Sequence, residues 1–168
     1  SGVRFDLALK NLNYIDKLCA KHISGQMSIA PEHICSDVLA IMQKPSLKTY
    51  KEYVSQFKKA SKKHGKQQYL IPYFIAAHPG CTLQHMYELA IYVKENHIRV
   101  EQVQNYIPIP LTLSEAMYYS EYNVFSLEKI HIPKEDERLM QRALLQPYLK
   151  TNHRLLKKAL KLLHKESS

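Results

Sequence analysis

The fold is decided by a nearly continuous apolar stretch, Tyr69-Leu70-Ile71-Pro72-Tyr73-Phe74-Ile75-Ala76-Ala77. A run of this length predicts a strand buried on both faces, as in a parallel sheet. Pro72 complicates this assignment, because proline cannot donate to a strand ladder and prefers edges or bulges. Upstream, the alternating residues Gln26–Ala30 predict a strand that Pro31 ends, and downstream Val100–Ile107 predict another.

Helices are predicted around these strands. Amphipathic spacing of apolar residues covers four stretches, residues 7–22, 36–43, 47–64 and 83–96. Ser46 and Thr82 are placed to cap the third and fourth of these helices, and Gly65 is placed to end the third in a left-handed conformation. Alternating strands and helices predict βαβ units, and therefore an α/β protein with a parallel sheet.

The pattern changes after Pro110. An irregular, aromatic-rich connection and then two final helices are predicted over residues 117–132, 135–146 and 152–165. We therefore divide the chain into an α/β part, residues 1–112, and a C-terminal part, residues 113–168, which holds the connection and a helical extension.

Composition excludes several classes of protein. The chain has 168 residues, enough for about one domain. It contains no apolar run near the roughly 20 residues of a membrane span, and no secretory or transit signal opens it. Its first residues, from Ser1 to Asp6, resemble the interior of a longer protein. Three scattered cysteines, Cys19, Cys35 and Cys81, are too few for a disulfide scaffold and indicate a reducing, cytoplasmic location.

Positive charge is concentrated in two predicted helices. The formal net charge is +9. Residues 46–66 hold seven lysines against one glutamate, and residues 150–165 hold five lysines and one arginine without an acid. Such runs are usually solvated helix faces, but they also suit an anionic partner such as RNA. Both interpretations stay open at this point.

Polar residues follow the carboxyl ends of the three predicted strands, where α/β proteins place their sites. Glu32, His33, His78 and Asn105 are expected on one rim. A metal site from Glu32, His33 and His78 is chemically reasonable, although no ligand pair has close helical spacing. A Cys81 nucleophile activated by His78 is a second alternative, which lacks an orienting acid nearby. The plainest interpretation of each residue alone is an ordinary hydrogen-bonded loop residue.

Six segments carry a resemblance to a known family, namely Gly25–His33, Met42–Pro45, Gln68–Gly80, Gln102–Pro108, Ala116–Tyr119 and Gln141–Leu145. In order and spacing they resemble the YgiQ-like (UPF0313) family of radical S-adenosylmethionine proteins, over nearly the whole chain. The resemblance implies a partial (β/α) barrel, the back half of a radical S-adenosylmethionine barrel, followed by the C-terminal helical extension.

The resemblance also implies an enzyme that reductively cleaves S-adenosylmethionine to start radical chemistry on an unknown substrate. Such enzymes bind a four-iron, four-sulfur (4Fe-4S) cluster through a CxxxCxxC loop. That loop is absent here, so the cluster ligands are expected in a missing N-terminal half, and the segment alone is expected to be inactive and prone to self-association. The alternatives are a basic RNA- or anion-binding module without catalysis, and a structural domain with an inert rim.

By resemblance, four residues are expected to bind the cofactor: Arg4, Glu32, Lys44 and His78. Glu32 would accept hydrogen bonds from cofactor hydroxyls. Lys44, or alternatively Arg4, would pair with the methionyl carboxylate, and the competing interpretation of Lys44 is a solvated lysine after a short helix. His78 would border the adenine or meet the substrate. Ala77 and Cys81 stand where many relatives have Gly and Glu, which weakens any contact that needs those residues.

Overall fold

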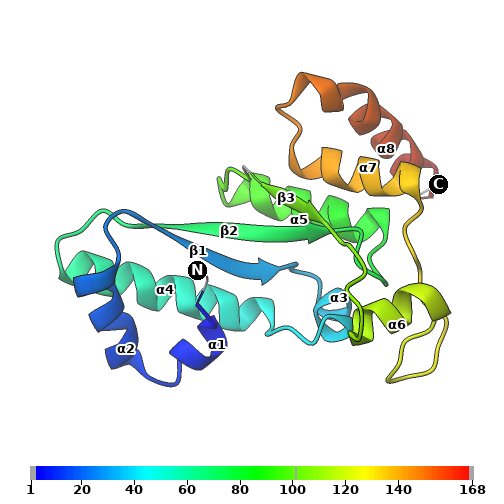
Figure 1. The fold of residues 1–168 in the computed structure, drawn as a ribbon. Helices are drawn as coiled ribbons and strands as arrows, with labels where there is room; N and C mark the ends of the chain where they lie inside the picture. The colour runs from blue at the N-terminus through cyan, green and yellow to red at the C-terminus, as the bar shows by residue number, and fades with distance from the viewer. Residues whose placement is uncertain (1–2, 101, 167–168) are drawn as a thin grey trace.

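The computed structural model describes residues 3–100 and 102–166 as a mixed α/β structure (Figure 1). Three parallel strands form its sheet, in the order β1 (Gln26–Glu32), β2 (Tyr69–Ala76) and β3 (Val103–Asn105). The helices of the described residues are α1 (Phe5–Ala8), α2 (Leu12–Lys17), α3 (Ser36–Ile41), α4 (Leu47–Lys63), α5 (Leu83–Glu95), α6 (Leu113–Ser120), α7 (Glu135–Leu145) and α8 (His153–Glu166), with a π-helical turn at Leu18–His22 and a 3-10 turn at Lys150–Asn152. The predicted parallel α/β class is confirmed.

Helices α4 and α5, which precede and follow β2 in the chain, begin and end at the predicted signals. The Ser46 hydroxyl accepts the Thr49 backbone N–H at the start of α4, and Thr82 caps α5 in a reciprocal capping box. Gly65 follows α4 with a φ of 63°, the left-handed conformation expected of it. Local side-chain chemistry therefore sets the ends of both helices.

The N-terminal helix differs from the prediction. Residues 7–22 form α2 and a π-helical turn, preceded by the separate short helix α1, and not one continuous helix. Asn11 lies outside helical geometry, with φ −141°, and its side chain accepts the Tyr14 N–H, so it begins α2 as a cap. Asn11 caps α2 and therefore separates it from α1, and the spacing of the apolar residues could not reveal this break.

Pro72 lies in the central strand, but at a position where the sheet pairing is irregular, as is usual for prolines within sheets. It pairs with Ile29 of β1, and the register of the two strands shifts immediately afterwards, before Glu32. On the other side, β3 pairs with β2 only from Phe74 onward. Among the described residues, Pro72 has a pairing partner in β1 alone, beside the register shift, where a missing N–H is tolerated.

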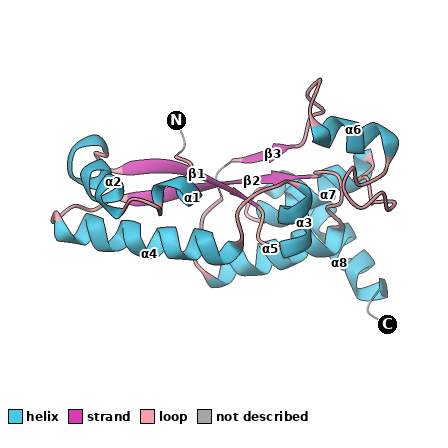
Figure 2. Ribbon diagram, turned by 90° about the horizontal axis from the view of Figure 1, so that it is seen from below, coloured by secondary structure: helices cyan, strands magenta, loops and turns pink. Residues whose placement is uncertain are grey.

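The two faces of the sheet are unequally covered. Met27, Ile29, Phe74 and Ala76 lie on one face and are buried. Helices α4 and α5 lie along this side of the strands (Figure 2). The intervening residues of β2, such as Tyr73, point to the opposite face and are half-buried. Alternation along each strand thus separates a packed face from an open one.

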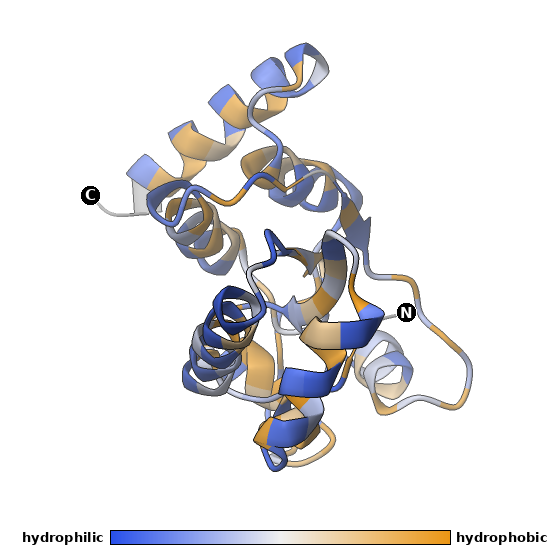
Figure 3. Cartoon of the chain, turned by 90° about the vertical axis from the view of Figure 1, so that its left-hand side faces the viewer, coloured by the Kyte–Doolittle hydropathy of each residue, from blue (hydrophilic) through white to orange (hydrophobic). Residues whose placement is uncertain are grey.

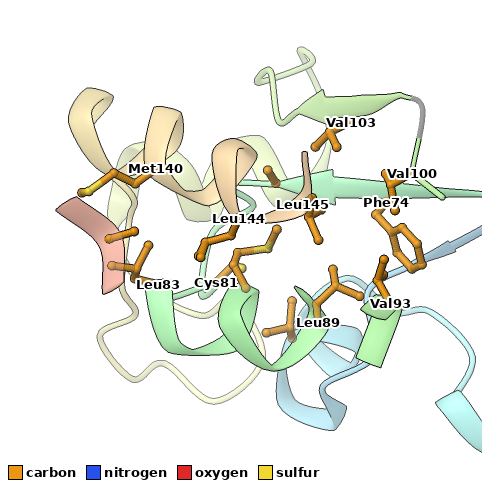
Figure 4. Close-up of a cluster of buried hydrophobic side chains, with 14 of the residues drawn as sticks. Phe74, Cys81, Leu83, Leu89, Val93, Val100, Val103, Met140, Leu144 and Leu145 are labelled. Atoms are coloured by element: carbon orange, nitrogen blue, oxygen red, sulfur yellow. The ribbon is translucent and has the colours of Figure 1, made fainter. Parts of the chain in front are cut away.

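Two hydrophobic clusters hold the molecule together. One joins α1, α2 and α4 to β1 and includes Ile15, Ile29 and Phe57. The other joins β2, β3 and α5 to α7 and α8, with Phe74 and Leu144 among its members (Figure 4). The two predicted final helices are confirmed, and α8 carries clearly separated apolar and polar faces (Figure 3). The hydrophobic core is therefore continuous across residue 112.

The connection after Pro110 is more regular than predicted. Residues 113–120 form α6, which the sequence analysis missed, whereas residues 122–132 are irregular apart from one bridge between Tyr122 and Lys129. The Thr112 side chain caps α6 by accepting the Glu115 N–H, and the Glu115 carboxylate accepts the Leu111 N–H. In the part of the chain that the structure describes, no helix has the length and apolar character of a membrane span.

Candidate functional site

The predicted site residues Glu32 and Lys44 meet at the carboxyl end of β1. The Lys44 Nζ lies 3.1 Å from the Glu32 Oε1, with 40% of the lysine side chain and 12% of the glutamate side chain exposed. Glu32 has a φ of 67° beside the shift in strand register, so the chain turns sharply there. Left-handed backbone at a non-glycine residue is strained, and such strain is common at functional sites.

Arg4 borders the same region. Arg4 and Lys44 both line a hollow of about 220 Å³ between the start of α1 and the loop after α3. The Arg4 guanidinium is already held by Asp6 through two hydrogen bonds of 3.0 and 2.7 Å. The hydrogen bonds from Arg4 lower the pKa of Asp6. Arg4 is thus brought near Lys44, with its charge shared with a carboxylate.

His78 lies at the end of β2 and is buried, with 4% of its surface exposed. Its Nδ1 is 2.8 Å from the Pro79 carbonyl, which can only accept, so this nitrogen carries the proton. Its Nε2, 2.9 Å from the Ser114 Oγ, therefore accepts the serine hydroxyl. Burial lowers the pKa of His78, and the positive charge of Lys44 lowers it further. The ring stays neutral and ties α6 to the sheet.

The loop after β2 is fixed by a buried amide. Gln141 of α7 is fully buried; its Oε1 accepts the Ala77 N–H at 2.8 Å, and its Nε2 donates to the Cys81 carbonyl at 2.9 Å. Ala77 has a φ of 62° and Gly80 a φ of 83°. The backbone at Ala77 favours glycine, which gives a physical reason for the glycine that the family resemblance expects there.

The alternative in which His78 activates Cys81 is wrong. Cys81 is fully buried, its Sγ lies 3.7 Å from the Nε2 of His33, and burial raises the pKa of its thiol. Burial also lowers the pKa of His33 to about 3. A protonated thiol beside a neutral imidazole makes an interior polar contact. Among the described side chains, those of residues 3–100 and 102–164, no three of His, Cys, Asp or Glu are arranged to hold a metal ion, which removes the support for a site at Glu32, His33 and His78.

Near the end of β3, two buried polar atoms, one from the strand and one from α7, lack hydrogen-bond partners among the described residues. Within the described part of the chain, the buried Asn105 Oδ1 and Arg138 Nη1 have no hydrogen-bond partner. The Arg138 Nη2 donates to the Tyr106 carbonyl at 2.6 Å, next to the end of β3. Unpaired buried polar atoms are expensive, and in native proteins they are often completed by a ligand or water.

We call Glu32, Lys44, His78, Asn105 and Arg138 the carboxyl edge of the sheet. Glu32, His78 and Asn105 were predicted to lie on this rim and Lys44 to bind the cofactor, whereas Arg138 and the Ser114 that binds His78 were not predicted. Ser114 lies within a Thr112-to-Glu115 capping pattern, which would have revealed α6. Arg138 had no signal, because it is one arginine following three acidic residues of the first turn of α7.

The carboxyl edge fits the polar groups of S-adenosylmethionine. Lys44 and Arg138 are donors for a carboxylate, and Glu32 and Asn105 are acceptors for hydroxyl or amino groups. The cysteines do not fit an iron–sulfur cluster: Cys19 and Cys81 are buried in different hydrophobic clusters, and the Cys35 Sγ donates to Glu88 at 3.3 Å. Nothing in the described residues would hold the 4Fe-4S cluster.

Comparison with known proteins identifies the family. A UPF0313 protein of Methanocella arvoryzae is 47% identical over 161 residues, covering 95% of this chain and 27% of that relative. UPF0313 proteins of Methanosarcina mazei and Clostridium botulinum are 42% and 44% identical over 95% and 99% of this chain, and over 26% of each relative. The chain belongs to the UPF0313 family.

This UPF0313 chain spans about a quarter of the length of the curated relatives it matches. Its residues 101–167 also match a family described as "Domain of unknown function (DUF3362)". No solved structure matches the chain. The names of the relatives specify no activity, so the role of the carboxyl edge has to be argued from its geometry.

Proposed function

We propose that this UPF0313 segment is part of a radical S-adenosylmethionine enzyme and that its carboxyl edge binds the cofactor beside the substrate. One observation carries the proposal: at the carboxyl end of the parallel sheet lie the ion pair of Glu32 and the exposed Lys44, beside β1, and the unpaired polar atoms of Asn105 and Arg138, beside β3. Ligands of α/β sheets bind at this end. In the whole protein the sheet would form one side of a barrel, with its open face turned inward.

Each residue of the edge has a distinct role in this proposal. Lys44, which keeps part of its side chain exposed, exchanges its bond to Glu32 for the methionyl carboxylate. Glu32 then accepts hydrogen bonds from ribose hydroxyls. Asn105 and Arg138 complete their hydrogen bonding with the cofactor or the substrate. His78 acts through Ser114 by positioning α6, because both of its ring nitrogens are engaged within the chain.

When bound and reduced by an iron–sulfur cluster, S-adenosylmethionine supplies a carbon-centred radical that abstracts hydrogen from a substrate. The residues of this segment bind and orient the reactants for that chemistry. A cationic Lys44 fixes the carboxylate end of the cofactor, and neutral His78 adds no second positive charge beside it. The cluster and its ligands would come from the remainder of the protein.

The test is cofactor binding by a full-length UPF0313 protein that carries this segment. Replacing Lys44 by Ala should weaken S-adenosylmethionine binding by about 1–3 kcal/mol, the size of a lost charged hydrogen bond. Equilibrium dialysis measures this directly. Iron content should stay unchanged, because no residue of the carboxyl edge would touch the cluster.

Lys48→Ala is the matched control, because Lys48 is an exposed lysine of the same region and lies outside the edge. An equal loss of affinity in both variants would show that the effect is general electrostatics. Full affinity in Lys44→Ala together with Arg138→Gln would refute the assignment of the edge.

A further inference from the structure

A second hollow lies at the opposite, amino end of β2. It has a volume of about 700 Å³ and runs between α4 and the end of α5, over a floor formed by residues 69–72. We call it the amino-end groove. Its size is within the range of small-molecule and nucleotide sites. It is separate from the carboxyl edge, since it lies at the other end of the same strand.

Among the described residues, basic side chains line the groove and no acidic one does. Lys51 and Lys58 border it from α4, and His97 and Arg99 border it from the loop after α5, whereas no Asp or Glu lines it in the part of the chain that is described. Among those residues, neither lysine nor Arg99 forms an ion pair with a carboxylate. Positive charge that is not balanced inside the protein favours an anionic ligand.

The lysines of α4 and the loop after it differ in their partners. Lys63 pairs with Asp16 at 2.9 Å, and Lys66 donates to the carbonyls of Cys19 and Ala20. These two lysines tie α4 to the N-terminal helices. Lys51 and Lys58 instead line the groove one above the other, seven residues apart on one helix face. The lysine-rich stretch therefore divides into structural and unpaired members.

Aromatic rings accompany the cations. The Lys51 Nζ lies 5.4 Å from the centre of the Tyr92 ring, and Tyr69, at 59% exposure, borders the same groove. Rings interleaved with lysines and arginine suit a ligand that has both a flat aromatic part and a phosphate. An acidic peptide would use the charges and leave the rings without a partner.

We propose that the amino-end groove binds a nucleoside phosphate, either free or as an unpaired position of single-stranded RNA. The base stacks on Tyr92 or Tyr69, and the phosphate pairs with Lys51, Lys58 and Arg99. This binding is independent of the cofactor role of the carboxyl edge, so either proposal can fail without the other.

The experiment uses a full-length UPF0313 protein that carries this segment, with fluorescein-labelled decauridylate as the probe and binding followed by fluorescence anisotropy. The variant Lys51→Gln/Lys58→Gln should weaken binding at least tenfold, and the slope of log affinity against log salt should flatten by about 0.7 for each phosphate that is no longer neutralised. The control Lys48→Gln/Lys62→Gln removes the same charge from exposed lysines of α4 that do not line the groove, and it should retain most of the affinity.

A second variant tests the rings. Tyr92→Leu should weaken binding at least fivefold while leaving the salt slope unchanged, because stacking involves no counterion release. Competition by UMP separates the two sources of the nucleoside phosphate. If UMP displaces the labelled RNA at concentrations near the dissociation constant of that RNA, the ligand is a free nucleotide. If only longer RNA displaces it, the ligand is a position in an RNA strand. Equal losses in the two lysine variants, or equally tight binding of a decaglutamate peptide, would overturn the proposal.

Discussion

The two ends of the sheet differ in how their polar groups are satisfied. At the carboxyl edge, Glu32 is paired with Lys44 and His78 with Ser114, and the backbone is tightly turned. At the amino-end groove, Lys51 and Lys58 lack carboxylate partners among the described residues. Substitutions at the first end should therefore affect folding as well as binding, and substitutions at the second should affect binding alone.

The largest expected effect is at Gly80, beside the carboxyl edge. Gly80→Ala should lower the free energy of unfolding by about 2–3 kcal/mol, because the backbone of residue 80 has a positive φ and the new Cβ would displace the end of the Ile41 side chain. Urea denaturation measures it. Gly65→Ala is the control: its φ is similar and its Cβ would meet open space, so only about 1 kcal/mol should be lost. Equal losses would contradict the close approach to Ile41.

Gln141 should have the next largest effect. Gln141→Leu leaves the Ala77 N–H and the Cys81 carbonyl without their partner in the interior, which should cost about 2 kcal/mol of unfolding free energy. The exposed Gln84, which donates to Glu88 on its own helix, provides the comparison. We expect Gln84→Leu to change stability by less than about 0.5 kcal/mol. Similar values for both would show that the amide does not hold the loop.

The third effect depends on pH. Because burial lowers the pKa of His33 to about 3, the unfolded chain binds a proton that the folded chain excludes between pH 6.5 and 3. Stability from this group is complete above about pH 6.5 and falls with pH, by at most about 1.4 kcal/mol per unit. His33→Asn should reduce that slope in urea denaturations from pH 7.5 to 4.5. An unchanged slope would place the acid sensitivity elsewhere.

The smallest effect should be at the amino-end groove. Lys51→Gln removes a partly exposed cation–π contact with Tyr92, which is worth about 0.5–1 kcal/mol at most. The same urea measurements should show almost no change, although nucleotide binding is weakened. A loss as large as that of Gln141→Leu would mean that the two ends of the sheet do not differ in the way described.

Local signals in the sequence were sufficient for the parallel sheet and for the helices beside β2. Ser46, Gly65 and Thr82 act on their immediate neighbours, so their roles could be predicted without the fold. The break at Asn11 and the start of α6 at Thr112 also rest on capping side chains, but the first lay within a stretch interpreted by apolar periodicity and the second lay just before a connection predicted to be irregular. β3 is shorter than predicted because pairing with β2 limits it to three residues.

The candidate site was predictable only as far as strand ends indicate it. Glu32 and Lys44 were both predicted to bind the cofactor, and they do lie together as an ion pair. The bonds from His78 to Ser114 and from Gln141 to Ala77 join residues 36 and 64 positions apart, and these depend on how α6 and α7 return to the sheet. Cofactor binding by these residues stays a prediction.

The hydrophobic core around β2 extends across the boundary of the matched DUF3362 region. The matched DUF3362 region begins at residue 101, so it contains β3 and α7 but not β2 and α5, which pack against them. Its β3 has β2 as its neighbour in the sheet, and its α7 shares buried side chains with α5. A polypeptide made of that region alone would expose one strand edge and half of a core. The DUF3362 region therefore needs a preceding βα unit to complete its sheet and its core.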